Sequence, residues 1–282
     1  MERSGAELTG AVNVATEAHV LLAIDVGNTQ TVIGLYELDA ASTQRRPEDG
    51  LVEHWRVATD QERTSDEFAV LLQGLLAFGG RSLDDVDGVA VSSGVPRLTA
   101  GLRDLATRHL HDDPVVIEPG VRTGISILYE NPKEVGADRI ANAVAAHDLY
   151  GGPTIVVDFG TATTCDAVTA AGEYVGGAIA PGVEISMDAL VGRAAALRAV
   201  ELLEPRSVLG KSTVESIQAG AIYGFAAQVD GLCARIMGEL GDCAVVSTGG
   251  IADLISPLSE RIQHSEPWLT LHGLRLVYEK NG

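Results

Sequence analysis

The sequence is poor in cysteine, in aromatic residues and in positive charge. Its cysteines, Cys165, Cys233 and Cys243, show no Cys-x-x-Cys spacing, which argues against a disulfide framework or a zinc site. Aromatic residues make up 4% of the chain, too few to predict stacking platforms for nucleobases. Lys and Arg number 20 against 39 Asp and Glu, and the net charge of −19 repels phosphate backbones and anionic membrane surfaces. We therefore expect no nucleic-acid partner, no membrane partner and a reducing, cytoplasmic location.

Long hydrophobic runs are missing as well. No apolar stretch approaches the roughly 20 residues of a membrane span, and residues 1–19 lack the basic-then-apolar order of a signal peptide. We expect those 19 residues to form a disordered N-terminal extension. The rest of the 282-residue chain, with 46% hydrophobic and 21% charged residues overall, has the composition of a globular protein with two domains.

A strand, an acidic glycine turn and a second strand occur twice in the chain. The first copy reads AIDVGNTQTVIG around Asp25, and the second reads VVDFGTATTCDAV around Asp158. The two aspartates lie 133 positions apart, which indicates a duplicated domain rather than a solenoid repeat. A Gly-Gly-Pro sequence at 151–153 separates the copies, and we place the two domains at 20–151 and 152–282.

Helix and strand signals alternate through both halves. Thr64 and Glu67 have the spacing of a capping box at the start of a helix that Gly79 ends. Residues 39–50 are polar and are expected to form a loop. The other expected strands are 20–24, 31–38, 54–58, 86–92, 114–117, 154–157, 163–168 and 244–246, and the other expected helices are 96–110, 136–149, 214–226 and 251–258.

The turns carry the residues expected to bind phosphate. A turn that contains Gly27 exposes backbone N–H groups, which hold phosphate oxygens without a lysine, and Asn28 and Thr29 add side-chain donors. Asp25 would be repelled by phosphate and would instead hold Mg²⁺ through water. A third glycine turn, Ser-Thr-Gly-Gly at 247–250, follows a strand and precedes a helix. The chain has no Gly-x4-Gly-Lys-Ser/Thr sequence, which excludes a P-loop.

Together the three turns resemble the two phosphate motifs and the adenosine motif of the actin, Hsp70 and sugar-kinase superfamily. The resemblance implies an α/β fold of duplicated ribonuclease H-like (actin-like ATPase) domains with ATP in the inter-domain cleft. The residues expected to bind ATP or its phosphates are Asp25, Gly27, Asn28, Thr29, Gly160, Thr161, Gly249 and Gly250.

Further motifs make the sequence similar to one family in particular, the type III pantothenate kinases. They follow one another in order from about Leu21 to Tyr278, and only residues 1–19 and the loop at 39–50 look extra. One departure is Gln30, where the family usually has Asn, Arg or Ser. The motifs are DVGNT at 25–29, SSGVP at 92–96, YENPKEVGADR at 129–139, EVGADRIAN at 134–142, VVDFGTATT at 156–164, GGAIAPG at 176–182 and PWLTLHGL at 267–274.

This resemblance implies roles for the acceptor site. Asp138 corresponds to the base that accepts the proton of the pantothenate hydroxyl, and Arg139 to the residue that holds the substrate carboxylate. Tyr129 and Gly136 correspond to residues that line the pantothenate pocket. Thr213 corresponds to a threonine that the partner subunit of a homodimer contributes to a shared pocket.

Each of these residues also has a purely structural interpretation. Asp138 could serve only to stabilise a helix N-terminus, Arg139 could form a surface ion pair, and Tyr129 could pack in the core. Thr213 could cap the helix expected at 214–226. Asp158 has two functional interpretations, facing Mg²⁺ and phosphate or binding the monovalent cation, K⁺ or NH₄⁺, that the family requires, and it could also be purely structural.

The expected reaction is ATP-dependent phosphorylation of pantothenate to 4′-phosphopantothenate, the first step of coenzyme A synthesis. Two alternatives stay open. The first is a catalytically weak relative that acts as an accessory factor in gene expression, which would retain the fold. The second is another actin-like kinase, which would act on a sugar or on acetate. The three aspartates 25, 138 and 158 favour a kinase, and the GADR and YENP motifs favour pantothenate.

Overall fold

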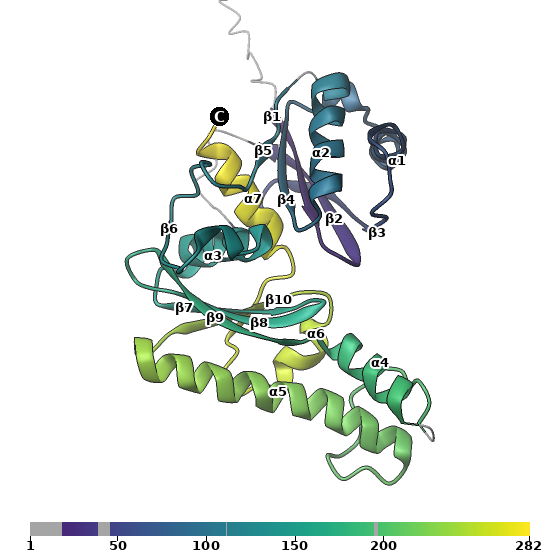
Figure 1. Cartoon of the computed structure of the whole chain (residues 1–282), viewed down its shortest axis with the longest axis vertical. Coiled ribbons are helices and arrows are strands. Elements are labelled where there is room, and N and C mark those ends of the chain that lie inside the picture. The colour runs from purple at the N-terminus through teal and green to yellow at the C-terminus, as the bar shows by residue number, and fades with distance from the viewer. Residues whose placement is uncertain (1–18, 39–45, 111, 195–196) are drawn as a thin grey trace, which may run out of the picture.

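The computed structural model describes residues 19–38, 46–110, 112–194 and 197–282. The expected N-terminal extension, apart from His19, and residues 39–45 of the expected loop lie outside these described residues. Within them, the chain forms two mixed sheets, one above the other, with helices between them and on their outer faces (Figure 1).

The first sheet has the strand order β3-β2-β1-β4-β5. Strands β1, β2 and β3 form an antiparallel meander, and β4 and β5 continue the sheet in parallel with β1. Both faces of β1 are buried, which explains its nearly continuous apolar sequence. The strands span His19–Val26 (β1), Gln30–Leu38 (β2), Leu51–Ala58 (β3), Gly88–Ser93 (β4) and Val115–Val116 (β5).

The second sheet repeats this plan as β9-β8-β7-β10-β11, with β6 added beside β9. Strands β7, β8 and β9 are again an antiparallel meander, and β10 and β11 again run parallel to β7. The duplication expected from the sequence is confirmed, and the fold is that of paired ribonuclease H-like, actin-like domains. The strands span Ser126–Ile127 (β6), Thr154–Phe159 (β7), Ala162–Val168 (β8), Glu173–Pro181 (β9), Ala244–Thr248 (β10) and His264–Ser265 (β11).

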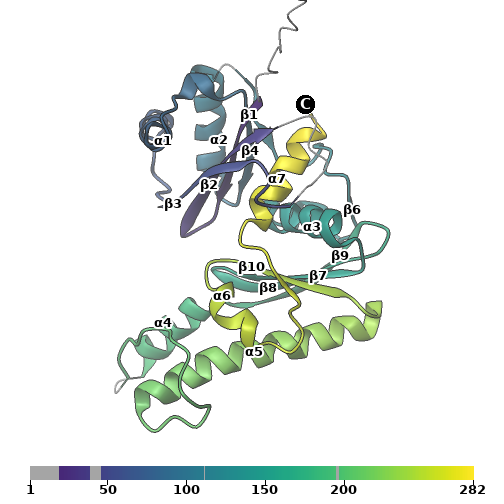
Figure 2. The ribbon, with the colours of Figure 1, turned by 180° about the vertical axis from the view of Figure 1, so that it is seen from behind.

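Helices fill three layers around the sheets. One apolar core joins α1 and α2 to a face of the first sheet, and another joins its opposite face to α3 and α7. The long helix α5 covers the outer face of the second sheet, as Figure 2 shows from behind. The α-helices span Ser65–Phe78 (α1), Pro96–Leu105 (α2), Ala137–Tyr150 (α3), Val183–Arg193 (α4), Thr213–Leu240 (α5), Ala252–Ile255 (α6) and Leu269–Glu279 (α7).

The expected capping box is present at the start of α1. The Thr64 hydroxyl accepts a hydrogen bond from the Glu67 backbone N–H, and the Glu67 carboxylate accepts one from the Thr64 backbone N–H at 2.9 Å. Both orphan donors of the first turn are thereby satisfied locally.

Two expected helices differ from the structure. The residue that caps α5 is Ser212, whose hydroxyl accepts from the Glu215 N–H, so the capping interpretation of Thr213 is wrong. The helix also continues past the expected end at residue 226 to Leu240, because its internal glycines keep helical geometry and the left-handed residue comes only at Gly241. The helix expected at 96–110 changes at Ala106 into a π-helical turn.

The packing of α7 bears on how the two halves are divided. This last helix of the chain contacts β1 and β4 of the first sheet as well as α3. Helix α3, in turn, contacts β7 and β8 of the second sheet. Helices α3 and α7 each contact the sheet of the other half of the chain. The domain boundary at residues 151–152 therefore stays a prediction. Across the described residues, no helix has the length and apolarity needed to cross a membrane.

Candidate active site

A cleft of about 530 Å³ lies between the two halves, where their glycine turns meet. It is lined from both halves by the glycine turns and by the first turn of α3. Eleven of the fourteen sequence-predicted site residues border it. They are Asp25, Gly27, Asn28, Thr29, Asp138, Arg139, Asp158, Gly160, Thr161, Gly249 and Gly250.

The two phosphate turns meet in this cleft. The first is closed by a hydrogen bond from the Gly27 N–H to the Gln30 carbonyl at 3.0 Å, and the second by one from the Gly160 N–H to the Ala162 carbonyl at 3.1 Å. The hydroxyls of Thr29 and Thr161 lie 3.2 Å apart and join the tips of the turns. Backbone donors and hydroxyls from both halves therefore converge on one place, which suits a chain of phosphates.

The third glycine turn packs directly against the second phosphate turn. Thr248 of β10 pairs with Asp158 of β7, and Gly249 follows with a φ of +101°. A Cβ atom on Gly249 would lie 2.6 Å from Oδ1 of Asp158 and from the Phe159 backbone. Both the conformation and the space require glycine here.

The carboxylates of Asp25 and Asp158 sit at the ends of the equivalent strands β1 and β7. Burial raises the pKa of Asp25 to about 8 and that of Asp158 to about 7, and the Asp138 carboxylate adds to both shifts. Oδ1 of Asp25 is buried with no hydrogen-bond partner among the described residues. An aspartate pair of this kind has the chemistry to hold a cation at the cleft floor.

Asp158 is also held by a chain of two hydrogen bonds, a relay, from residues of two helices. Asn142 of α3 donates from Nδ2 to Oδ2 of Asp158 at 3.1 Å, and Thr270 of α7 donates to Oδ1 of Asn142 at 2.8 Å. The relay fixes the orientation of the Asp158 carboxylate. Asn142 belongs to the EVGADRIAN motif, although sequence reasoning gave it no role.

Asp138 projects from the first turn of α3. Its Oδ1 accepts a hydrogen bond from the Arg139 N–H at 2.8 Å, so one oxygen does serve the helix N-terminus. A Cβ on Gly136 would lie 2.4 Å from that oxygen, which explains the glycine. The side chain is open to the cleft, yet poor solvation by the surrounding protein raises its pKa. A carboxylate with a raised pKa suits proton transfer.

Arg139 is buried and paired rather than lying at the surface. Its Nε donates to both oxygens of Asp166, at 3.0 and 3.1 Å, and its Nη2 donates to Oδ1 of Asp166. Asp166 is 1% exposed and also accepts from Tyr174 at 2.7 Å and Thr164 at 2.9 Å. The surface ion-pair interpretation of Arg139 is therefore wrong, and the guanidinium is fixed against the cleft wall.

Sequence comparison agrees with this geometry. The model of the family described as type III pantothenate kinase matches residues 21–235, more than half of the chain. The chain belongs to the type III pantothenate kinase family. A type III pantothenate kinase of Streptomyces avermitilis is 55% identical over 271 residues, covering 93% of this chain and 98% of the relative. One of Thermobifida fusca is 51% identical over 267 residues, covering 93% of this chain and all of the relative.

Similar solved structures are more distant and bear on the fold alone. A Campylobacter jejuni protein described as a Baf family transcriptional activator has a TM-score of 0.57 and 17% identity, covering 92% of this chain and 98% of that one. The ethanolamine utilization protein EutJ of Carboxydothermus hydrogenoformans has a TM-score of 0.52 and 14% identity, covering 91% and 89%.

The three remaining predicted site residues, Tyr129, Gly136 and Thr213, lie outside the cleft lining. Gly136 stands directly behind Asp138. Tyr129 is half-buried against Gly176, with its ring centroid 6.2 Å from that of Tyr174. Because Tyr174 donates to Asp166, Tyr129 lies at the end of the network that holds Arg139.

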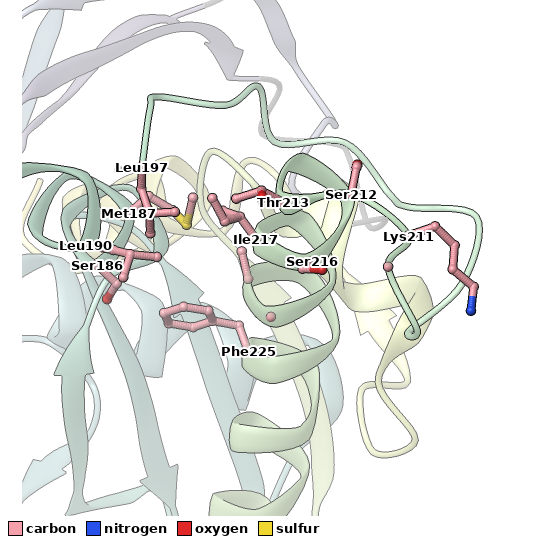
Figure 3. Close-up of a pocket in the computed structure, with 13 residues that line it drawn as sticks. Ser186, Met187, Leu190, Leu197, Lys211, Ser212, Thr213, Ser216, Ile217 and Phe225 are labelled. Carbon is pink, nitrogen blue, oxygen red and sulfur yellow. The ribbon is translucent and has the colours of Figure 1, made fainter. Parts of the chain in front are cut away.

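Thr213 is not brought to the cleft within one chain. It is exposed at the start of α5 and borders a separate cavity of about 870 Å³ between α4 and α5. Figure 3 shows Met187 and Leu197 facing Thr213 and Ile217 there, while Lys211 points away.

Sequence reasoning missed several cleft residues. One residue behind the cleft lining, Asp166, had a signal, since it is the only charged residue of strand β8 and it holds Arg139. Arg56 of β3 lines the cleft without any motif to mark it. Glu184 and Asp188 of α4 also line it, and nothing in their spacing distinguished them from solvated helix residues.

Proposed function

We propose that the chain transfers the γ-phosphoryl group of ATP to the primary hydroxyl of pantothenate, the first step of coenzyme A biosynthesis. The observation that carries this proposal is the convergence of two glycine phosphate turns with the GADR carboxylate and arginine in one cleft, in a member of this family. The product is 4′-phosphopantothenate. The enzyme acts in the cytoplasm, a location that its three free, buried cysteines support.

The nucleotide occupies the floor of the cleft. Backbone N–H groups around Gly27 and Gly160, with the hydroxyls of Thr29 and Thr161, face its phosphates. The turn at Gly249 packs on the second phosphate turn and closes the nucleotide site from the second half. Phosphoryl transfer has a loose transition state, so these groups act by positioning the phosphates and by stabilising their charge.

The acceptor occupies the side of the cleft formed by α3. Asp138 takes the proton from the attacking hydroxyl at its free oxygen Oδ2, while Oδ1 stays hydrogen-bonded to the backbone. Arg139 holds the pantothenate carboxylate with Nη1, because Nε and Nη2 are engaged by Asp166. Gly136 leaves room for Oδ1 of Asp138, and Tyr129 packs against Tyr174, which donates to the Asp166 carboxylate that holds Arg139.

The residues present fit the expected cations. The unpartnered Oδ1 of Asp25 suits water-mediated binding of Mg²⁺. Burial raises the pKa of both strand-end aspartates, and a cation beside them would keep them ionised. Among the described residues, no group of three or more His, Cys, Asp or Glu is arranged to hold a metal by itself, so Mg²⁺ at Asp25 would also need water and phosphate oxygens as ligands. Asp158 is the proposed ligand of K⁺ or NH₄⁺. When bound, the cations neutralise the charge of the phosphates.

The active unit is a homodimer with a shared substrate pocket. Of eleven exposed large hydrophobic residues in the described chain, seven lie between residues 179 and 214, on β9, α4, the following loop and the start of α5. An apolar surface of this kind marks an interface. Thr213 lies among these residues, so a partner subunit seated there brings Thr213 close to a second subunit.

Complementation tests the shared pocket. Thr213→Ala and Asp138→Asn, each nearly inactive alone, are mixed under conditions that exchange subunits, with Thr213→Arg as the stronger variant. A heterodimer has one site with both lesions and one with neither, so activity returns toward about one quarter of wild type. No recovery despite demonstrated exchange, or a monomer in light scattering, overturns the shared site.

A coupled assay tests the reaction itself. The full chain is given ATP, Mg²⁺ and K⁺ with pantothenate, and in parallel with glucose or acetate. Turnover with pantothenate alone, lost in Asp138→Asn, is expected. Turnover with another acceptor supports a different actin-like kinase. No turnover with any acceptor, by a protein that still binds ATP, supports the accessory-factor alternative, against which the three retained aspartates argue.

A further inference from the structure

Arg56 lies at the mouth of the cleft between the two halves of the molecule. It sits on the edge strand β3, paired in register with Val32 of β2. Its Nη1 donates to Oε1 of Gln30, the residue that follows the first phosphate turn, at 3.2 Å. On the other side, a Cβ atom on Gly250 would lie 3.0 Å from the same Nη1. The guanidinium thus touches the first phosphate turn and the Ser-Thr-Gly-Gly turn at once.

The strand that carries Arg56 is fixed to the phosphate turn. Thr59, just after β3, donates from its hydroxyl to the Gly27 carbonyl at 2.8 Å and from its N–H to the Thr29 carbonyl at 3.0 Å. Its hydroxyl also lies 2.9 Å from that of Thr31. These hydrogen bonds fix the distance between Arg56 and the backbone groups that face the phosphates.

The charges of the cleft single out Arg56. Five carboxylates line it, and the lining cations are Arg56 and Arg139. Arg139 is neutralised by the buried Asp166. No described carboxylate lies within ion-pair distance of Arg56, which is exposed and held only by an uncharged amide. A site of this composition needs a cation for an anionic ligand, and a planar guanidinium matches phosphate oxygens in geometry.

We infer that Arg56 binds the phosphate chain of the nucleotide across the mouth of the cleft, with Gln30 orienting its guanidinium. The inference rests on the proposed use of ATP. It also gives a role to Gln30, which departs from the residues usual at that position. Its amide oxygen accepts from Arg56 without neutralising it, so the positive charge stays available to the phosphates.

The test compares ligands that differ only in phosphate. Calorimetry measures the binding of ATP and of adenosine to wild type, Arg56→Gln, Arg56→Lys and Gln30→Ala. Arg56→Gln weakens ATP binding about 10–100-fold and leaves adenosine binding unchanged, since the lost hydrogen bonds are to charged groups. Arg56→Lys is intermediate, because it keeps the charge without the fork. Gln30→Ala weakens ATP binding about 2–10-fold.

The matched control is Arg97→Gln, which removes an exposed arginine of α2 that is paired with Glu62 and is not among the residues that line the cleft. It leaves the binding of both ligands unchanged. Equal loss of ATP and adenosine binding in Arg56→Gln would mean that Arg56 only shapes the cleft, and undiminished ATP binding would exclude a phosphate contact. Both outcomes overturn the inference whether or not pantothenate is the acceptor. Wild type that binds ATP without phosphorylating pantothenate overturns the proposed acceptor, and the ATP-to-adenosine comparison still decides the role of Arg56.

Discussion

The two strand–turn–strand units occupy equivalent places in their sheets, yet their turns differ in length. The first returns from Val26 to Thr31, and the second returns from Phe159 to Thr163, one residue sooner. The shift changes which residue of the returning strand faces each helix layer. Ala23 pairs with Gly34, whereas Val156, its counterpart in the second unit, pairs with Asp166.

The two similar hairpins therefore have different roles in the structure. At Gly34 the absent side chain leaves room for Leu271 of α7, whose Cδ1 would lie 2.7 Å from an added Cβ. At the counterpart position Asp166 instead anchors Arg139 of α3. The first unit thus packs against a helix, while the second holds Arg139, the residue proposed to bind the pantothenate carboxylate. A duplicated fold supports an asymmetric reaction because equivalent positions carry different side chains.

The strand-end aspartates differ in the same way. Oδ1 of Asp25 is buried without a partner, whereas Oδ2 of Asp158 accepts from Asn142. Asp138 raises the pKa of both, so it lies within electrostatic reach of each turn. These three carboxylates are the places at which the comparison can be tested.

The largest effect is expected from the carboxylate that acts on both turns. Asp138→Asn keeps the shape and removes the base, so kcat falls by about 10²–10⁴-fold. Steady-state kinetics on protein verified as folded by circular dichroism measures this. Turnover near wild type would leave Asp138 with the helix N-terminus as its only role.

The next effect separates the two strand-end aspartates. Asp25→Asn lowers Mg²⁺-dependent turnover by about 10²–10³-fold and leaves pantothenate binding intact, because charge stabilisation at the phosphates is lost. Asp158→Asn instead raises the half-saturating K⁺ concentration about tenfold, equivalent to about 1.4 kcal/mol. Titrations of each cation against activity measure both. The same response to both cations in both variants would show that the two turns are not specialised.

A smaller effect is expected from the position where the hairpins differ most. Asp166→Asn removes the charge that holds Arg139, so the KM for pantothenate rises about 10–100-fold, with a smaller change in kcat. The control is Gly34→Ala in the first hairpin, where crowding of Leu271 costs about 1–3 kcal/mol of stability without changing that KM. A drop in kcat alone for Asp166→Asn would argue against a positioning role for Asp166.

The last effect concerns the stability of the ligand-free protein and not its activity. Between the ordinary carboxyl pKa of 3.8 and the folded pKa of about 8, folded Asp25 keeps a proton that the unfolded chain has released. Stability therefore falls as pH rises through this window, by at most about 1.4 kcal/mol per pH unit for one group. Asp25→Asn removes this contribution. Thermal melts from pH 5 to 8 with parallel slopes for both proteins would mean that Asp25 is ionised throughout.

The sequence by itself determined the repeated units and the phosphate turns. Gly27 and Gly160 follow apolar strands, and each turn is closed by hydrogen bonds within a few residues. The capping box at Thr64 is equally local. Such features are predictable because their partners are neighbours in the chain. The start of α5 was harder even locally, since Ser212 and Thr213 are both suitable caps and only the backbone selected Ser212.

Only the tertiary structure decided which distant groups come together in the cleft and behind its lining. Asp166 lies 27 residues from Arg139, and Thr270 lies 128 residues from Asn142, so no local sequence pattern predicts either contact. Arg56 became a cleft residue because β3 is the edge strand nearest to the turn at Gly250 in the other half. Charge and hydrogen bonding act through space, and the packing of two sheets around α3 and α7 sets those distances.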